Sequence, residues 1–298
     1  MPELPDVVIY LEALAPRVIS QPLERFRIGN PFIVRTIEPA PAAFEGKRVE
    51  RLHRMGKRLV FEFEEDLFLV LHLMIAGRLR WRERGAAMPG KVGLAAFDFP
   101  TGTLVLTEAG SKRQASIHLL HGAAGLAEFQ RGGLEVLDSM MPEFAERLTR
   151  DNHTLKRALT DPTIFSGIGN AYSDEILHAA KLSPMKQTRQ LTESEIARLH
   201  LATITTLQTW IDRTRDEVGE GFPEKVTAFR EGMAVHGRYG KPCPTCGSPV
   251  QRIVYASNEC NYCATCQTEG RLLSDRALSR LLREDWPRTL EEMERRKA

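Results

Sequence analysis

The sequence has no long apolar segment and no excess of either charge. Among its 298 residues, no apolar run reaches the roughly 20 residues that a membrane-spanning helix needs, and no secretory signal is visible. The 41 basic and 39 acidic residues leave a formal net charge of only +2. We therefore expect a cytoplasmic chain without a membrane partner. Any binding of nucleic acid has to come from a local basic surface, because bulk charge does not supply it.

Cysteine is missing from most of the chain, and all five cysteines lie between Cys243 and Cys266. A disulfide framework would be spread over a secreted chain, so this tight cluster indicates a metal and a reducing compartment. Sixteen residues separate the pair Cys243 and Cys246 from the pair Cys263 and Cys266. That spacing is typical of a closed, structural Zn²⁺ site, because four thiolates leave no position for a substrate. Cys260 is left over and remains an alternative ligand.

The remaining pattern predicts an α+β fold with enough apolar residues for a substantial core. Hydrophobic residues make up 42% of the chain, which suits one large or two medium domains. Apolar residues recur at helical spacing over 7–20 and over 192–218. Between about 23 and 120, short β-like runs at 58–64, 68–72 and 102–107 are separated by turn residues. These runs predict a β-sandwich or flattened barrel, followed by a helical region.

The first six residues carry a candidate nucleophile. Proline at position 2 favours removal of Met1, which would leave Pro2 with a free secondary amine. An α-amino group titrates near pH ~8, so a fraction is unprotonated at neutral pH. Such an amine forms an iminium with an aldehyde-level carbon, and the adjacent Glu3 supplies an acid/base partner. An ordinary proline-rich start is the alternative interpretation.

A glycine-containing turn ahead of a helix provides a candidate anion site. Gly167 and Gly169 precede a helical run that opens near Asn170, which is a suitable N-cap. Glycine lets the backbone approach a phosphate closely, and the free N–H groups of a helix start bind anions. Lys156 lies on the short helical run just before the turn. We expect Lys156, Asn170 and this helix start to hold backbone phosphates, which position DNA without reading its sequence.

Four stretches of the sequence, in the same order, resemble the formamidopyrimidine-DNA glycosylase / endonuclease VIII family: Met1-Pro2-Glu3-Leu4-Pro5-Asp6, Gly56-Lys57-Arg58, the run from His72 to Leu79, and the run from Leu155 to Leu177. The resemblance implies a bifunctional DNA glycosylase and AP lyase that excises oxidised bases and nicks abasic DNA through a Pro2 iminium. It implies Pro2, Glu3 and Lys57 as catalytic residues and damaged double-stranded DNA as partner. One structural Zn²⁺ per chain, a monomer and a place beside the bacterial nucleoid are also expected.

The chain departs from the family pattern at three proposed DNA contacts. Ile75 stands where relatives carry a methionine that fills the gap left by a flipped nucleotide. Arg113 lies in a loop whose family phenylalanine is absent here, and Asn258 replaces an arginine that grips phosphates around the lesion. These departures leave two alternatives to an ordinary member: a glycosylase for bulky or alkylated lesions, and a non-catalytic damaged-DNA-binding protein of the same fold.

We expect four regions along the chain. Residues 1–121 form an N-terminal β-sandwich catalytic domain, and residues 122–235 form a helical domain with a helix–two-turns–helix. Residues 236–270 form the zinc finger. Leucine pairs from Leu272 to Leu282 recur at helical spacing and predict a C-terminal helical extension over 271–298.

Overall fold

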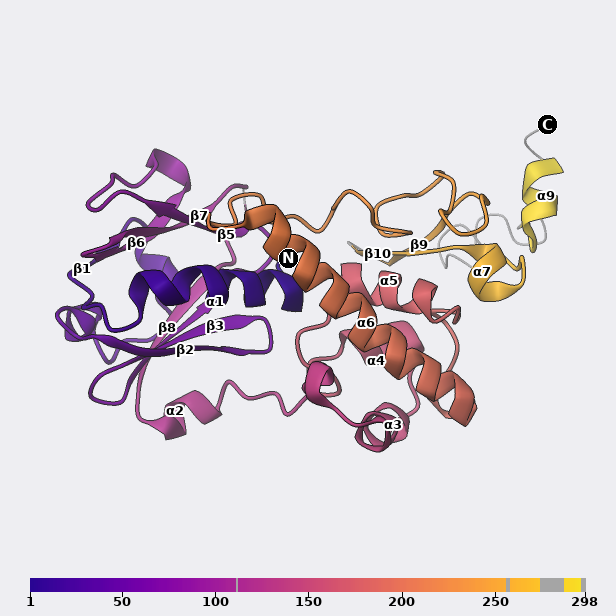
Figure 1. Ribbon diagram of the computed structural model, residues 1–298, viewed down its shortest axis with the longest axis horizontal. Coiled ribbons are helices and arrows are strands. Elements are labelled where there is room, and N and C mark those ends of the chain that lie inside the picture. The colour runs from indigo at the N-terminus through magenta and orange to yellow at the C-terminus, as the bar shows by residue number, and fades with distance from the viewer. Residues whose placement is uncertain (111, 256–257, 274–286, 296–298) are drawn as a thin grey trace. The chain divides into compact units, whose positions relative to one another are not determined.

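The computed structural model describes residues 1–110, 112–255, 258–273 and 287–295 (Figure 1). The chain divides into two compact units. Unit 1 comprises Met1–Arg131 and Trp210–Ala228, and unit 2 comprises Gly132–Thr209 and Phe229–Ala298. Helix α6, Glu193–Val218, contributes residues to both units and confirms the helix expected over 192–218. Within the described ranges, no helix is long and apolar enough to cross a membrane.

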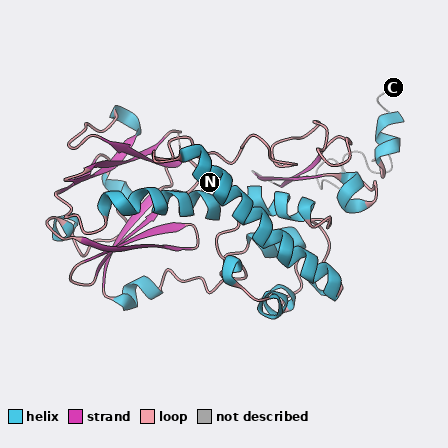
Figure 2. Cartoon of the chain, in the orientation of Figure 1, coloured by secondary structure: helices cyan, strands magenta, loops and turns pink. Residues whose placement is uncertain are grey.

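Unit 1 is built on two four-stranded antiparallel sheets (Figure 2). One sheet has the order β1-β6-β7-β5, with bounds Arg25–Ile28, Gly93–Phe99, Gly102–Glu108 and Gly77–Arg82. The other has the order β2-β3-β4-β8, with bounds Val49–Met55, Arg58–Phe63, Leu67–His72 and Ser116–His121. The three strands expected at 58–64, 68–72 and 102–107 are confirmed as β3, β4 and β7.

Alternation along β3 explains how this sheet is covered on both faces. Leu59, Phe61 and Phe63 point into the main core, which also takes in side chains of the other sheet. Val60 points the opposite way, into a smaller cluster that includes Leu126 of helix α2, Ala123–Ala127. A strand whose successive side chains face opposite sides can serve two cores at once.

Helix α1, Leu4–Val18, packs one apolar stripe into the main core of unit 1. Val7, Tyr10 and Leu14 are fully buried and recur every three or four residues. The helix expected over 7–20 begins earlier, at Leu4, because Pro5 lies in its first turn. There a missing N–H costs nothing, since it has no acceptor within the helix. The first residues of the chain therefore adjoin a rigid element.

Unit 2 combines helices with a two-stranded antiparallel sheet. Its helices include α3 (Met141–Thr149), α4 (Leu155–Thr160), α5 (Asn170–Ala179), the first part of α6, and α7 (Ala264–Thr268). Its strands are β9 (Gln251–Tyr255) and β10 (Asn258–Tyr262). The helix expected from the leucines between 272 and 282 lies mostly outside the described ranges, and α9 (Leu290–Arg295) follows them.

The turn between α4 and α5 completes the expected helix–two-turns–helix. Gly167 adopts a φ of +83°, a left-handed conformation that favours glycine. Gly169, and not Asn170, is the N-cap of α5, so the expectation for Asn170 was wrong by one position. The Asn170 side chain is engaged elsewhere, since its Nδ2 donates to the carbonyl oxygen of Glu259 at 2.8 Å. The fold is α+β, with a β-sandwich and a helix–two-turns–helix region.

Candidate functional site

Pro2 and Glu3, directly before α1, are buried, and Met1 is partly exposed. Glu3 is the N-cap of this helix, and its backbone N–H donates to Asp6 Oδ2 at 2.9 Å. In return, the Glu3 carboxylate accepts a hydrogen bond from the backbone N–H of Asp6. This reciprocal capping box satisfies two N–H groups of the first turn. It also fixes the Glu3 carboxyl directly after Pro2, which is itself buried.

The terminal amino group sits among two cations and two carboxylates. Burial lowers the pKa of this amino group below its ordinary value. Glu3 and Asp6 oppose that effect, whereas Arg78 and Lys57 lower the pKa further. This shift belongs to the Met1 amine, because the Pro2 nitrogen is an amide nitrogen until Met1 is removed. The structure therefore brings Glu3 and Lys57 to the electrostatic surroundings of the terminus.

Lys57 lies in the two-residue turn between β2 and β3. Met55 pairs with Arg58 across this turn, and Gly56 takes a φ of +62°. Such a short turn requires a positive φ and leaves the backbone little freedom. The position of Lys57 is therefore set by the paired strands on either side.

Ile75 lies in the loop between β4 and β5, and 63% of its surface is exposed. This exposure excludes a core role in the described structure and leaves an apolar side chain open to solvent. Arg78 supports the loop by donating from Nη1 to the carbonyl oxygen of Ile75 at 3.1 Å. Its Nε also donates to the carbonyl oxygen of Val226 at 2.6 Å. Sequence reasoning passed over Arg78, although it lies in the motif that contains Ile75.

Arg113 is exposed on the loop between β7 and β8 and donates from Nη2 to the carbonyl oxygen of Lys91. The base of this loop is closed by the buried carboxylate of Glu108. That carboxylate accepts from the backbone N–H groups of Gln114 and Ala115 at 3.0 and 3.1 Å. The loop thus presents a cation although the family phenylalanine is absent.

His72, at the end of β4, is a titratable residue beside Arg58 and Lys57 that the sequence analysis did not single out. Burial, together with the nearby Arg58, Lys57 and His118, lowers the pKa of His72 to about 4. Its ring is therefore neutral at pH 7 and lies in a positive field. Such a field favours an anionic ligand. In the sequence, the signal that could have identified His72 as a candidate site residue was its place as the first residue of the motif from His72 to Leu79.

Lys156 and Asn170 meet at the start of α5 in unit 2. Lys156 Nζ donates to Asn170 O at 2.7 Å, to Ser173 Oγ at 2.8 Å and to Asp174 Oδ1 at 2.6 Å. These three contacts match the three N–H donors of an ammonium group. The structure therefore brings the two expected phosphate ligands together and holds both through hydrogen bonds to the protein.

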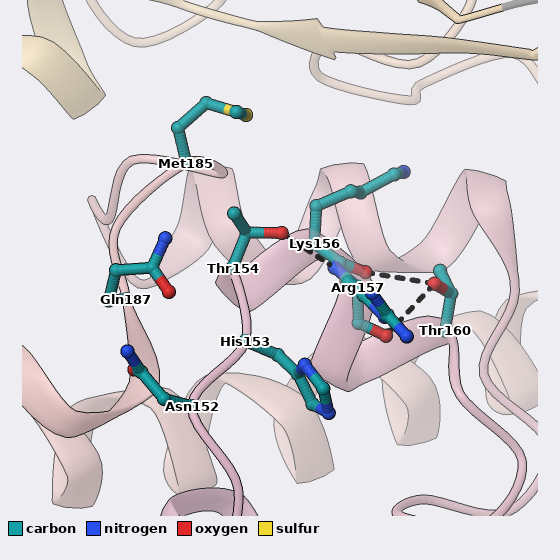
Figure 3. Close-up of a pocket in the computed structure, with 8 residues that line it drawn as sticks. All are labelled: Asn152, His153, Thr154, Lys156, Arg157, Thr160, Met185 and Gln187. Carbon is teal, nitrogen blue, oxygen red and sulfur yellow. Dashed lines mark hydrogen bonds between the residues drawn. The ribbon is translucent and has the colours of Figure 1, made fainter.

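A cavity of about 510 Å³ adjoins Lys156 (Figure 3). Its lining residues are Asn152, His153, Thr154, Lys156, Arg157, Thr160, Met185 and Gln187. Three of these eight side chains are basic, and none of the eight is acidic. In Figure 3 the Lys156 side chain extends away from the His153 ring. Arg157, Asn152 and Gln187 offer hydrogen-bond donors that suit an anionic group such as a phosphate, whereas Lys156 Nζ is already paired with Asp174 Oδ1.

Four cysteines form a group that can hold a metal ion. The Sγ atoms of Cys243, Cys246, Cys263 and Cys266 all lie within 4.8 Å of one another. A tetrahedral zinc site with Zn–S bonds of about 2.3 Å places its sulfurs about 3.8 Å apart, so this donor set fits zinc. None of the five cysteines forms a disulfide. Within the described residues Cys260 stands outside this group, and burial raises the pKa of its thiol.

Asn258 is the first residue of β10, where it pairs with Tyr255. The side chain of Asn258 is outside the part of the chain that the structure describes. Its expected contact with DNA therefore stays a prediction.

Two domain profiles of one family match the sequence. The formamidopyrimidine-DNA glycosylase N-terminal domain matches residues 1–113, and the formamidopyrimidine-DNA glycosylase H2TH domain matches residues 134–220. A formamidopyrimidine-DNA glycosylase of Thermus thermophilus is 33% identical over 279 residues. The match covers 91% of this chain and 100% of that protein.

Solved structures show the same likeness over most of the chain. A variant of the Lactococcus lactis protein, in complex with DNA that contains Fapy-dG, has a TM-score of 0.80 and 28% identity. MutM in complex with DNA that contains carbocyclic 8-oxo-G has a TM-score of 0.79 and 29% identity. Each match covers 90% of this chain and 100% of the other. The chain therefore belongs to the formamidopyrimidine-DNA glycosylase family.

Proposed function

We propose that this chain is a bifunctional DNA glycosylase and AP lyase that removes oxidised bases from double-stranded DNA. Members of its family carry both activities. The observation that carries the proposal is the buried Pro2, which lies directly before the capped Glu3 at a chain end whose electrostatic surroundings include Lys57. The protein acts as a monomer on DNA in the cytoplasm, beside the nucleoid.

Removal of Met1 makes the Pro2 nitrogen the nucleophile. This nitrogen attacks C1′ of the damaged nucleotide, and a new C–N bond forms as the glycosidic bond breaks. The base departs with the bonding electron pair and takes up a proton. After the Pro2 nitrogen loses its own proton, its lone pair forms the iminium double bond to C1′ while the C1′–O4′ bond breaks.

Glu3 acts as the acid that protonates O4′ when the sugar ring opens. The capping hydrogen bond from the Asp6 N–H holds its carboxyl in place. Removal of a proton from C2′ then drives β-elimination, in which the C3′–O bond breaks and the 3′ phosphate leaves. Lys57, fixed in its tight turn, contacts the phosphate beside the lesion and stabilises the charge that develops there.

The remaining proposed contacts hold the DNA open for this chemistry. Ile75 is an exposed apolar side chain that fits the space left by a flipped nucleotide. Arg113, Asn258 and the Lys156–Asn170 pair contact backbone phosphates. The four cysteines Cys243, Cys246, Cys263 and Cys266 bind one structural Zn²⁺, which holds the finger folded and takes no part in the chemistry.

Borohydride trapping on abasic DNA tests the proposed nucleophile. The iminium should be reduced to a stable covalent adduct, and Pro2→Gly should severely weaken trapping. Glu3→Gln keeps the amine and should lose base excision. An undiminished adduct in Pro2→Gly would point to a lysine such as Lys57 and overturn the assignment. Intact mass shows whether Met1 is removed. A protein that retains Met1, binds damaged DNA and forms no adduct would be a damage-binding protein instead.

A further inference from the structure

Helix α5 contacts the cysteine-bearing segment along its whole length. At its first residue, the side chain of Asn170 donates to a carbonyl oxygen in β10. In its middle, Asp174 Oδ2 accepts from the backbone N–H of Asn261 at 3.1 Å. In its last turn, His178 Nε2 lies 3.3 Å from Cys243 Sγ. The helix and the finger therefore form one hydrogen-bonded assembly within unit 2.

The contact between His178 and Cys243 is shielded from solvent. Only 7% of His178 and 2% of Cys243 is exposed. Four thiolates around one divalent cation carry a net charge of minus two, and buried charge is costly unless hydrogen bonds compensate it. Groups that hydrogen-bond to metal ligands hold them in orientation and retain the metal. A neutral imidazole has one N–H donor to offer such a thiolate.

The geometry favours a donor role for His178 over a role as metal ligand. The atoms that gather within 4.8 Å of one another are the four cysteine sulfurs, and the His178 nitrogens are not among them. The cysteine sulfurs already complete a tetrahedral set. The ring nitrogen Nε2 of His178 contacts the sulfur of Cys243.

We propose that His178 is a positioning residue of the metal site, in which its Nε2–H donates a hydrogen bond to the Cys243 thiolate and slows loss of the metal. The proposal rests on the proposed binding of zinc by the four cysteines. It ties the last turn of α5 to the finger through a metal ligand, while the first turn of the same helix carries the proposed phosphate site.

Zinc release from the full-length, zinc-loaded protein tests this role. His178→Phe keeps a ring of similar shape without the donor, and His178→Gln restores an N–H donor. His200→Phe is the matched control, because His200 is a partly buried histidine of the same unit whose Nε2 contacts Ser139 O at 3.0 Å. With excess EDTA and a coloured zinc indicator, His178→Phe should release zinc about 10-fold faster. His178→Gln should release it more slowly than His178→Phe, and His200→Phe should match the natural protein.

Nuclear magnetic resonance of cadmium-substituted protein reads the hydrogen bond directly. The proton should reside on Nε2 of His178 and show a scalar coupling to the cadmium through the Cys243 sulfur. A proton on Nδ1, or equal release rates in His178→Phe and His200→Phe, would overturn the proposal. A natural protein that is purified without zinc and takes up none would instead refute the proposed zinc site itself. The two failures are therefore distinct.

Discussion

Lys156 and Asp174 form an ion pair in which Nζ and Oδ1 are 2.6 Å apart, the Asp174 side chain is fully buried and the Lys156 side chain is 13% exposed. Asp174 also accepts from His236 Nδ1 at 2.8 Å and from the backbone N–H of Asn261. The Asp174 carboxylate in α5 therefore connects three parts of unit 2. They are α4 through Lys156, the segment before the cysteines through His236, and β10 through Asn261. The lysine that family resemblance assigns to DNA is also a structural partner.

We predict that Lys156→Met lowers the free energy of unfolding by about 3–5 kcal/mol, because it leaves the buried Asp174 carboxylate without its cation. Lys47→Met is the matched control. Lys47 pairs with Glu65 at the surface, where an ion pair contributes at most about 1 kcal/mol. Chemical denaturation of both variants measures the difference. Equal losses would show that the pair in unit 2 is as weakly coupled as the surface pair.

The ion pair between Lys156 and Asp174 also affects how DNA affinity should depend on salt concentration. Removing one phosphate-contacting cation reduces the salt slope by about one unit, and we expect this for the exposed Arg113 in Arg113→Gln. Lys156→Gln should reduce the slope by less, because Asp174 already neutralises its ammonium group. Binding titrations at several salt concentrations measure both slopes. If Lys156→Gln reduced the salt slope by a full unit, Lys156 would have to leave Asp174 and bind a phosphate in the complex with DNA.

Metal content should distinguish the fifth cysteine from the other four. The purified protein should contain one zinc per chain, and Cys246→Ala should lose it together with DNA binding. Cys260→Ala should keep the metal, since Cys260 lies outside the group of four sulfurs. Elemental analysis of protein that has not been exposed to a chelator measures the zinc content of each variant. Zinc retained in Cys246→Ala and lost in Cys260→Ala would exchange the two assignments.

Acid should destabilise unit 1 in part through His72. The pKa of His72 is about 4 in the folded chain, against about 6.5 for an unperturbed histidine. Between these values the unfolded chain binds the proton and the folded chain does not, so stability falls as pH decreases from about 6.5 to about 4. Denaturation at a series of pH values should show a shallower fall in His72→Gln. The exposed His121, replaced by Gln, should leave the natural profile unchanged.

Local patterns in the sequence were sufficient to predict β3, β4 and β7 and the cysteine group. Leu59, Phe61 and Phe63 alternate because a sandwich strand buries every second side chain in one core. The cysteine spacing is equally local, since two short knuckles have to bring four sulfurs together. In both cases the residues that define the feature lie close together in the chain.

Other features depend on distant residues and leave no local signal. Phe222 packs against Tyr10 and Trp81 in unit 1, although the chain passes through unit 2 before it returns. Asp174 and Glu175 look like the solvent face of a helix by composition, yet both are buried. They are buried because their carboxylates accept hydrogen bonds from groups elsewhere in unit 2, which helical periodicity does not reveal.

Asn258 should determine which cleavage product dominates. In relatives, the arginine that Asn258 replaces places a fixed charge against the phosphates around the lesion. Without that charge the sugar is held less firmly after the first elimination, so we predict mainly β-elimination products from abasic DNA. Asn258→Arg should tighten binding by about 1.5–3 kcal/mol at most, the range for a charged hydrogen bond, and should raise the share of β,δ-elimination. A denaturing gel of the 3′ ends, run for both proteins at two salt concentrations, measures this share. If the natural protein already yields mainly the 3′ phosphate, another residue supplies the arginine's charge, and position 258 does not control the second elimination.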